Sequence, residues 1–403
     1  MKKRDLRHGY TTGACAAAAA KGAARMLRDQ AMVDEVEITL PRGETVRFRL
    51  HGQAFGPDAA SCYVVKYAGD DPDVTNGAEI HARVTLNPPR PSFAEGGGAA
   101  KRDLSKNGSD SPSPQPSPTR GEGAIFFTPP PSMGGGQGEG EIIIEGGVGV
   151  GRATKPGLAV AVGEWAINPV PRKMITQAVL EVFSPHPSPL TPHVVISIPN
   201  GEELAKKTLN ARLGIVGGLS ILGTTGIVRP VSSKAWTDTI DAAIDVALAC
   251  GCPTLVLSTG RTSELAAQRS LALPEESYIM MGDHAGHALR ACAGKGVREI
   301  VLAGQFAKLL KIACGQEQTH VSSSRLDLRT LAEWLEGSSR LARLAPRALR
   351  ANTARELLES TGVNADLLSL VCGRAARFAS ELAPGCRVKV FLAGYAGEML
   401  YFG

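Results

Sequence analysis

The sequence predicts an α/β protein of two domains, an N-terminal α+β domain over residues 1–235 and a C-terminal, Rossmann-like, mostly parallel domain over residues 236–403. The second half repeats the order apolar strand, glycine-containing turn, helix, which is typical of a parallel sheet covered on both faces. The first half opens with an alanine-rich helical segment and continues with strands of alternating polarity. A chain of 403 residues is long enough for two cores.

The opening segment RHGYTTGACAAAAAKGAARML (7–27) predicts a helix, because alanine is the best helix former and basic residues recur at helical spacing. Thr11 or Thr12 can cap this helix with its hydroxyl oxygen. Gly9 and Gly13 suit a sharp bend or a close backbone approach. Two interpretations stay open here: a capped, tightly packed helix, or a helix N-terminus that binds an anion.

Strands follow in the first half. Residues 34–50 predict a hairpin, residues 61–67 and 78–86 a second strand pair, and residues 141–147 a further strand. Residues 88–140 are rich in Pro, Gly and Ser and cannot bury enough apolar surface to fold, so we expect a disordered insertion there. We expect the strands before and after the insertion to be neighbours, because lengthening a surface loop costs little closure entropy.

The second half is more regular. Its strand–turn–helix units cover residues 254–268, 277–296 and 298–315, and a further strand is expected at 387–394. Residues 326–383 have a helical pattern without glycine-rich turns, and we expect them to be structural. Ligands of open parallel sheets bind outside the carboxyl ends of the strands, so the strand-end turns are the expected cofactor site.

Each of these turns places glycine beside a strand end, where backbone N–H groups can meet a nucleotide-like ligand. The turns are Ser258-Thr259-Gly260-Arg261, Met281-Gly282-Asp283 and Ala303-Gly304-Gln305. We therefore assign cofactor binding to Gly260, Gly282, Asp283 and Gly304. The carboxylate of Asp283 could bond ribose hydroxyls or could cap its own helix, and both interpretations stay open.

Polar and glycine-rich segments of the first half carry further alternatives. Asp70, Asp71 and Asp73 surround a proline turn and are either a polar turn or candidate catalytic acids. The segment GGVGVGRATKPG (146–157) resembles a phosphate-binding loop but lacks the spacing of a dinucleotide or Walker loop. A basic helix with Lys206, Lys207 and Arg212 is either a solvated face or a site for carboxylates.

Composition narrows the functional classes. The charged fraction is 21% and the hydrophobic fraction 43%, as in ordinary globular proteins. A net charge of +5 and only 5% aromatic residues fit an anionic small molecule better than nucleic acid. The eight cysteines are scattered and read as reduced and buried. His284 and His287 lack a third ligand at suitable spacing, so we predict no metal site.

The expected cellular location of the protein is inferred from two kinds of targeting segment that the sequence lacks. The start MKKRDLRHGY contains no apolar run, so we expect no signal peptide. No stretch of about 20 apolar residues is present for a membrane span. We therefore expect a cytoplasmic protein without a membrane partner.

Several segments together resemble the CbiD family, in the family's order from residue 7 to about residue 320. They are RHGYTTGACAAAAAK, VVKYAGDDPDVTNG, EGGVGVGRATKPGL, GEWAINPVPRKMI, KKTLNARLGIVGGLSILGTTGIV, MGD, and GQFAKLLKIACG with His320 after it. Tyr67 and Asn76 depart from the family pattern, which has Asp and His there, so neither position is expected to act directly as an acid or base. The insertion at 88–140 is also foreign to the family pattern.

The resemblance implies a cobalt-precorrin-5B C1-methyltransferase of anaerobic cobalamin biosynthesis, which uses S-adenosylmethionine and gives cobalt-precorrin-6A. Cobalt then belongs to the corrinoid substrate, and the protein itself needs no metal. With this substrate, N–H, hydroxyl and basic groups are expected to hold its carboxylates. The residues assigned to substrate binding are Thr11, Thr12, Gly13, Lys155, Lys206, Lys207, Arg212 and His320.

Two rival functions are weighed against this one. An NAD(P)-dependent oxidoreductase would carry a GxGxxG turn with an acid about 20 residues further on, which the sequence lacks. An RNA-binding protein would carry aromatic platforms or an RNA-binding signature, and neither is present. A homo-oligomeric state is compatible with the sequence.

Overall fold

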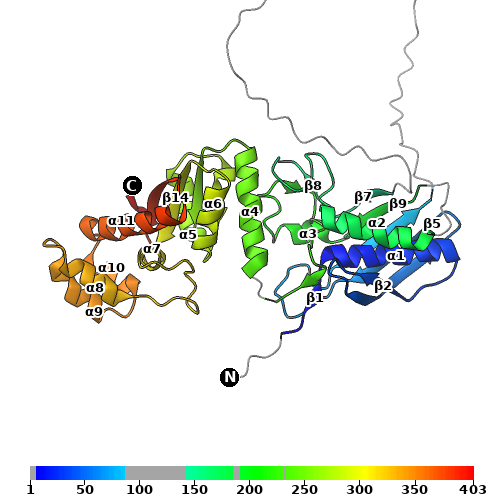
Figure 1. Ribbon diagram of the computed structural model, residues 1–403, viewed down its shortest axis with the longest axis horizontal. Helices are drawn as coiled ribbons and strands as arrows, with labels where there is room; N and C mark the ends of the chain where they lie inside the picture. The colour runs from blue at the N-terminus through cyan, green and yellow to red at the C-terminus, as the bar shows by residue number, and fades with distance from the viewer. Residues whose placement is uncertain (1–5, 87–141, 185–190, 231–232) are drawn as a thin grey trace, which may run out of the picture.

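The computed structural model describes residues 6–86, 142–184, 191–230 and 233–403. They form a mixed α/β fold with one hydrophobic core in the first half, between Ala14 and Ile221. The second half has a core on each face of a sheet, within residues 240–393. Helix α4 (Ser233–Ala249) stands between the two halves in Figure 1 and adds Ile240 and Ile244 to the second-half core. The predicted insertion at 88–140 lies outside the described residues.

The first half is built on a five-stranded sheet of order β4-β5-β6-β9-β7. Its strands are β4 (His51–Phe55), β5 (Ala59–Val65), β6 (Glu79–Thr85), β9 (His193–Ser197) and β7 (Ile143–Gly146). Neighbours are antiparallel except β7, which runs parallel to β9. The predicted pairing of the second strand pair is confirmed by β5 and β6. The predicted hairpin is confirmed by β2 (Glu35–Thr39) and β3 (Thr45–Arg49).

The prediction that the strands flanking the insertion are neighbours is wrong, because β9 lies between β6 and β7. Thr85 of β6 and Ile143 of β7 both stand opposite His193 of β9, so they are two strand spacings apart, about 9–10 Å. The parallel neighbours β7 and β9 are joined through helix α2 (Pro169–Phe183), as parallel strands require a crossover. This crossover unit places β9, not β7, against β6.

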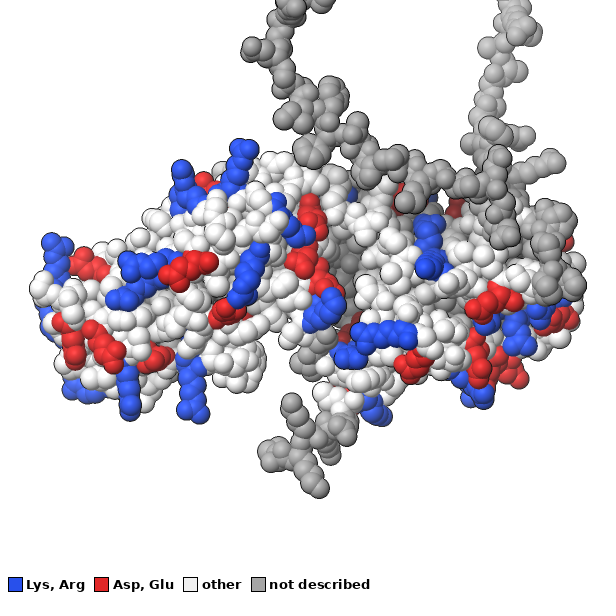
Figure 2. All heavy atoms as spheres, in the orientation of Figure 1, with Lys and Arg blue, Asp and Glu red and all other residues white. Residues whose placement is uncertain are grey.

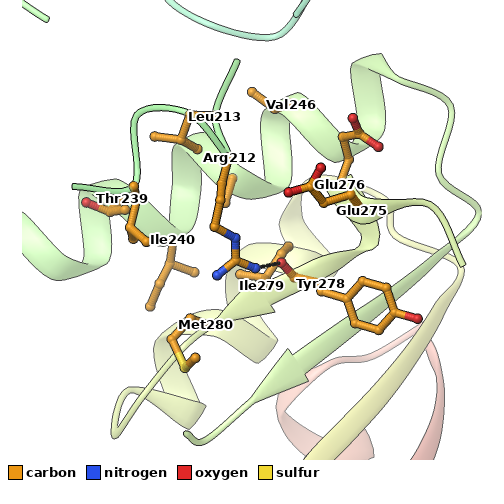
Figure 3. Close-up of a pocket in the computed structure, with 12 residues that line it drawn as sticks. Arg212, Leu213, Thr239, Ile240, Val246, Glu275, Glu276, Tyr278, Ile279 and Met280 are labelled. Atoms are coloured by element: carbon orange, nitrogen blue, oxygen red, sulfur yellow. Dashed lines mark hydrogen bonds between the residues drawn. The ribbon is translucent and has the colours of Figure 1, made fainter. Parts of the chain in front are cut away.

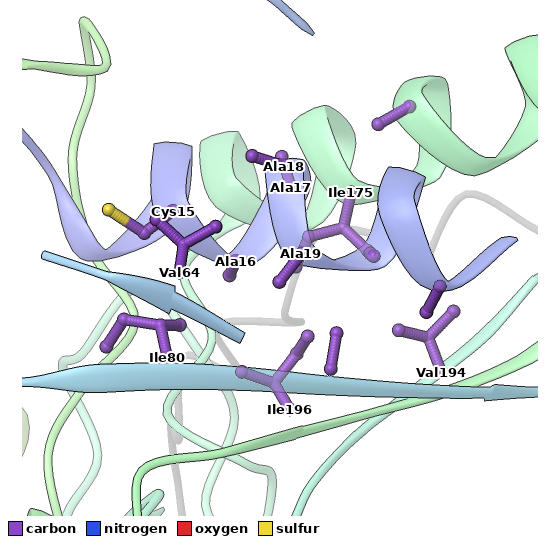
Figure 4. Close-up of a cluster of buried hydrophobic side chains, with 14 of the residues drawn as sticks. Cys15, Ala16, Ala17, Ala18, Ala19, Val64, Ile80, Ile175, Val194 and Ile196 are labelled. Carbon is purple, nitrogen blue, oxygen red and sulfur yellow. The ribbon is translucent and has the colours of Figure 1, made fainter. Parts of the chain in front are cut away.

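Helix α1 (Thr12–Asp29), which confirms the predicted helix, packs beside α2 on one face of this sheet (Figure 1). Residues 14–20 of α1 are at most 1% exposed, so the helix is enclosed on all sides. Figure 4 shows its alanines close to Ile80 and Ile196 of the sheet, with Ile175 of α2 beside them. The alanine run therefore does more than favour a helix: its small side chains let three layers approach closely.

The second half contains a five-stranded sheet of order β13-β12-β14-β15-β16. Its strands are β12 (Thr254–Ser258), β13 (Tyr278–Met280), β14 (Glu299–Gln305), β15 (Arg387–Ala393) and β16 (Met399–Phe402). The first four in that spatial order are parallel, and β16, which the sequence did not predict, is an antiparallel edge. The predicted strand–turn–helix units are confirmed by α5 (Arg261–Ser270), α6 (Ala285–Gly294) and α7 (Phe306–Ala313).

Helices cover both faces of this sheet. Alanines of α5 pack with Val256, Val301 and Phe391 on one face, whereas α4, α6 and α7 pack on the other. The helical prediction for residues 326–383 is confirmed by α8 (Leu328–Glu336), α9 (Ala345–Arg350), α10 (Ala354–Thr361) and α11 (Ala365–Leu382). Because α5 and α6 leave on opposite faces, the connections change direction between β12 and β14, which is where a parallel sheet opens to a ligand.

Short elements complete the fold. They are β1 (Gly9–Tyr10) with β11 (Ile227–Val228), β8 (Arg152–Ala153) with β10 (Ile215–Val216), helix α3 (Gly201–Ala205), and the 3-10 turns η1 (Glu275–Ser277) and η2 (Ala342–Leu344). The two small strand pairs tie the segments that carry the family resemblance to one another.

Candidate functional site

The turns after β12, β13 and β14 lie side by side at one edge of the second-half sheet. The amide of Gly282 donates to the carbonyl of Ser258 at 3.2 Å, and the amide of Thr259 donates to the carbonyl of Ala303 at 2.9 Å. The structure therefore brings together the three turns that the sequence assigned to one cofactor site. Their edge includes the switch in strand order between β12 and β14.

The glycines of these turns differ in the space in front of them, and Gly260 has the most. A Cβ atom placed on Gly260 would meet no described atom within 4 Å. A Cβ on Gly304 would lie 3.1 Å from the Leu309 side chain and 3.2 Å from the Thr259 hydroxyl oxygen. At Gly282, where φ is +59°, the nearest atoms belong to the ring of Trp236, 3.3 Å away. The backbone of the β12 turn is therefore open at Gly260, whereas side chains of the protein approach Gly282 and Gly304 closely.

Asp283 follows Gly282 and is held in place by two partners. Its Oδ1 atom forms an ion pair with the Lys308 ammonium and accepts a hydrogen bond from the Thr319 hydroxyl at 2.6 Å. Burial opposes ionisation of this carboxyl, but the two bonds outweigh burial and lower its pKa. Helix α6 has His284 at its N-cap and no side-chain capping bond, so the interpretation of Asp283 as a helix cap is wrong.

Trp236 was missed by the sequence analysis. Its indole N–H donates to the Met281 carbonyl at 3.1 Å, and 44% of the residue remains exposed beside Gly282. It lies on α4, outside the repeated strand–turn–helix units, so no local pattern marked it. Lys308 and Thr319 were also missed, because their partner Asp283 is distant in sequence.

The N-terminal motif of the first half is closed to solvent. The Thr11 hydroxyl caps α1 by accepting from the Ala14 amide at 3.2 Å. The Thr12 hydroxyl donates to the Leu222 carbonyl at 3.1 Å and accepts from its amide at 3.0 Å. Both threonines are at most 6% exposed. The capping interpretation is confirmed for Thr11, and anion binding by Thr11, Thr12 and Gly13 stays a prediction.

The three acids of the 70–73 turn have partners within the protein. Arg7 contacts both oxygens of Asp70, and its side-chain hydrogen bond lowers the pKa of that carboxyl. Asp73 is paired with Lys66, whose side chain is 1% exposed. Burial raises the pKa of Asp73, but its bonds to Lys66 and Thr75 outweigh burial and lower it. Asp70 and Asp73 are therefore ionised near neutral pH and poorly matched to donate a proton there.

The two positions that depart from the family pattern border this turn. The Asn76 side chain accepts a hydrogen bond from the Ala68 amide at 2.9 Å, which fixes the turn. The Tyr67 carbonyl accepts from the Tyr10 amide at 2.7 Å, while the residue is 42% exposed.

The glycine-rich loop at 146–157 packs backbone against backbone. A Cβ on Gly149 would lie 1.9 Å from the Ile198 carbonyl oxygen, and one on Gly218 would lie 2.2 Å from the Gly149 oxygen. The amides of Gly147 and Gly151 donate to carbonyls of the protein at 2.7 and 2.9 Å. These contacts engage the amides of Gly147 and Gly151 within the first half, whereas Val148 of the same loop is 70% exposed.

Two basic residues assigned to substrate carboxylates face carboxylates of this chain. The Lys155 ammonium lies 2.9 Å from Glu276 Oε1, and Arg212 Nη2 lies 2.6 Å from Glu264 Oε1. Lys206 is exposed and paired with Glu203 at 2.5 Å. Lys207 is also exposed. The structure thus separates the basic residues into two kinds, those that bridge to the second half and those that face solvent.

The histidines have separate partners. His284 Nδ1 lies 2.8 Å from Gln318 Nε2, and burial lowers the pKa of His284. His287 Nε2 lies 3.0 Å from Asp241 Oδ1, and His320 is exposed with Nδ1 2.7 Å from the Ser322 hydroxyl. Within the described ranges, no group of three or more His, Cys, Asp or Glu residues could hold a metal ion.

Charges on the surface are mixed. Figure 2 shows Lys and Arg interspersed with Asp and Glu over the visible face. The helices formed by the described residues include none with the length and apolar character needed to span a bilayer.

The fold defines the class as a mixed α/β protein in which a parallel sheet offers glycine turns at one edge. The chain belongs to the CbiD family, which confirms the resemblance. The family model CbiD matches residues 1–112 and 132–230, and the model CbiD, C-terminal domain, matches residues 318–402.

Three relatives with similar sequences have the same name. A protein of Geobacter sulfurreducens is 60% identical over 406 residues, and one of Geobacter metallireducens is 58% identical over 413 residues, with 100% of each chain covered. A protein of Brucella anthropi is 38% identical over 97% of this chain and 93% of its own. All three are named cobalt-precorrin-5B C(1)-methyltransferase.

A solved structure is also similar to this chain. It is a cobalamin biosynthesis protein (cbiD) from Archaeoglobus fulgidus, 26% identical, covering 77% of this chain and 81% of that one with a TM-score of 0.36.

Proposed function

We propose that this chain is a cobalt-precorrin-5B C1-methyltransferase of cobalamin biosynthesis, which transfers a methyl group from S-adenosylmethionine to C1 and gives cobalt-precorrin-6A. The proposal is supported by identities of 58% and 60% with relatives of that name over the full chain. It is also supported by the match to both CbiD family models. The substrate is a small molecule that carries its own cobalt.

We assign the methyl donor to the strand-end turns of a Rossmann-like domain at residues 236–403, and the corrinoid to an α+β domain at residues 1–235. The observation that carries this assignment is the open space in front of Gly260 at the switch in strand order. Both described partners of Asp283 contact Oδ1, so we assign its Oδ2 to the donor's ribose hydroxyls. The exposed face of Trp236 is suited to stack on adenine.

The chemistry requires little from the protein beyond placement. The ring carbon C1 forms a bond to the methyl carbon, the sulfur–methyl bond breaks, and its electron pair stays on sulfur. Because a sulfonium is a reactive donor, alignment of the two substrates and exclusion of water supply most of the rate. Asp70, Asp71 and Asp73 remain the catalytic candidates from the sequence, and the low pKa of Asp70 and Asp73 suits them to accept hydrogen bonds or a cation.

Carboxylate arms of the corrinoid need cationic or hydrogen-bonding partners, on the first half and, at His320, on the second. Lys206, Lys207 and His320 are exposed and therefore accessible to such arms. A location in the cytoplasm and a homo-oligomeric state stay predictions.

Titration calorimetry of the purified chain with S-adenosylmethionine, NADPH and a short RNA tests the donor assignment. Binding of S-adenosylmethionine alone is expected. Incubation with cobalt-precorrin-5B and the donor should then give a product heavier by one methyl group. Binding of NADPH or RNA without binding of S-adenosylmethionine would contradict the proposal.

A further inference from the structure

Ion pairs connect the two halves of the protein beside β13. Lys155 and Arg212 belong to the first half, and their partners Glu276 and Glu264 belong to the second. The Lys155 ammonium also donates to the Arg212 carbonyl at 3.2 Å, so the two basic residues are linked. The Arg212 guanidinium also contacts residues that are distant in sequence. Glu264 is 52 residues away and Tyr278 is 66 residues away.

Glu264 is the buried member of this group. Its side chain is 0% exposed, and a buried carboxylate needs cationic and hydrogen-bonding partners. Arg261 Nη1 contacts Oε2 at 2.7 Å from the same helix, and Arg212 Nη2 contacts Oε1 at 2.6 Å from the other half. Each oxygen therefore has one guanidinium partner, and the two partners come from different halves.

Arg212 makes a second contact across the boundary. Its Nη2 atom donates to the Tyr278 carbonyl at 2.9 Å, at the start of β13 (Figure 3). The surrounding cavity between turn 209–213, α4 and β13 is about 30 Å³, room for about two waters and far too small for either substrate. Arg212 therefore stands in a packed contact between the halves and not in a ligand pocket.

Glu264 also adjoins the proposed donor site. It lies in the first turn of α5, directly after Gly260 and Arg261 of the β12 turn. The Ser263 hydroxyl donates to the Gly260 carbonyl at 2.9 Å, so the start of this helix and the turn form one unit. A shift of Glu264 would carry the turn with it.

We propose that Glu264 and Arg212 are a positioning pair, which fixes the donor turn at residues 258–261 in register with the first half that holds the second substrate. This inference rests on the proposed function. The lining of the cavity around Arg212 is largely apolar and has no directional preference, whereas hydrogen bonds to both oxygens of a carboxylate set its position and orientation. Methyl transfer requires such register, since a misplacement of about 1 Å costs about 100-fold in rate.

The pair can be weakened without losing the fold of the second half. After Arg212→Gln, the Glu264 carboxylate keeps Arg261 as an ion-pair partner three residues away on the same helix. The donor turn itself is unchanged in sequence. A positioning role therefore predicts a loss in the rate at saturation, not in the affinity for either substrate.

The test compares three variants of the pair with one control. The variants are Arg212→Gln, Arg212→Lys and Glu264→Gln. The control is Arg355→Gln, which removes an exposed Arg–Glu contact elsewhere in the second half. We expect kcat to fall about 10- to 100-fold in Arg212→Gln and Glu264→Gln, and to fall less in Arg212→Lys. The Kd values for donor and corrinoid, measured by calorimetry, should stay within about twofold of wild type in all three variants. The Arg355 variant should match wild type. The double variant Arg212→Gln with Glu264→Gln should lose no more than the worse single variant.

A second readout needs no turnover. Amide hydrogen exchange at residues 258–264 should accelerate in Arg212→Gln and stay at wild-type rates in Arg355→Gln. Unchanged exchange together with unchanged kcat would overturn the positioning role. A raised corrinoid Kd at normal kcat would overturn it in favour of direct substrate binding. If the wild-type chain itself transfers no methyl group, the proposed function fails, and the exchange experiment alone decides on the pair.

Discussion

Several glycines of the first-half motifs and Gly260 of the second half are used differently. In the first half, an added Cβ would collide with backbone at Gly9 (2.2 Å from Ala68), Gly69 (2.1 Å from Arg7), Gly149 (1.9 Å from Ile198) and Gly201 (2.1 Å from Gly149). In the second half, the strand-end glycine Gly260 faces open space. Glycines in motifs that look alike in sequence therefore serve close backbone packing at Gly149 and leave an open turn at Gly260.

Two Lys–Asp pairs, one in each half, also differ in exposure. In the first half, Lys66 and Asp73 form a pair around a closed turn, with the lysine side chain fully enclosed. In the second half, Asp283 and Lys308 are each about one-quarter to one-third exposed at the strand-end edge. The same kind of ion pair is thus enclosed in the first-half turn and partly exposed at the strand-end edge.

Gly149→Ala should break the packed half most severely. A methyl group would overlap the Ile198 carbonyl at 1.9 Å, and φ of +72° is unfavourable for alanine. We expect a loss of about 3 kcal/mol or more in stability, or insoluble protein. Gly260→Ala, at φ of −178° with open space, is the matched control and should melt like wild type. Equal melting temperatures for both variants would contradict the comparison.

Lys66→Met should also destabilise the first half, because it leaves the partly buried Asp73 carboxylate without its cation. Breaking such a pair costs about 3 kcal/mol. Adding Asp73→Asn to this variant should recover part of the loss, measured by denaturant unfolding of the single and double variants. A single variant as stable as wild type would show that the pair is dispensable.

The pH dependence of this pair has a defined sign. The folded state lowers the pKa of Asp73 below its usual value of 3.8, so the pair stabilises the protein fully above that pH. The contribution is lost as the pH falls through the lowered value. The stability difference between wild type and Lys66→Met should therefore be constant near neutral pH and narrow below pH 3.8. A difference that grows on acidification would contradict this assignment.

Thr11→Val tests whether the N-terminal motif caps a helix or binds substrate. Loss of the bond to the Ala14 amide should cost about 1 kcal/mol of stability. Because the hydroxyl is buried, corrinoid affinity should be unchanged in calorimetry. An affinity at least about tenfold weaker, which would correspond to a lost charge-assisted bond, would support the anion-binding interpretation instead.

Much of the fold could be predicted from the sequence, since it depends on local periodicity. The helix in residues 7–27 was predicted from its alanines and the spacing of its basic residues. The hairpin, the strand–turn–helix units and the helical segment after α7 were predicted from local apolar and glycine patterns. The position of β9 between β6 and β7 could not be, because a strand order results from a crossover and not from any one segment.

The candidate site was predicted only in part for a related reason. Glycine turns at strand ends are local patterns, whereas Trp236 reaches the same edge from another helix. The pairing of Arg212 with Glu264 joins residues 52 positions apart, so the sequence offered Arg212 as a free cation for substrate. Ion pairs between distant segments decide which basic side chains remain available to bind a ligand.

Deletion of residues 90–139 should have the smallest effect. Their composition predicts an insertion that the fold tolerates, since loop closure depends weakly on length. Because β9 separates the flanking strands, the replacement linker must cross about 9–10 Å, so about eight Gly and Ser residues are needed in place of a tight turn. Melting temperature and methyl transfer should match wild type. Loss of either property with this linker would give the segment a role.

The central claim is that the open strand-end edge of the second half binds the methyl donor. The most direct test is calorimetric titration of S-adenosylmethionine into Gly260→Val, whose side chain would fill the space in front of the β12 turn. We predict a donor Kd raised at least about tenfold with an unchanged melting temperature. A Kd equal to that of wild type in the well-folded variant would contradict the claim and place the donor elsewhere.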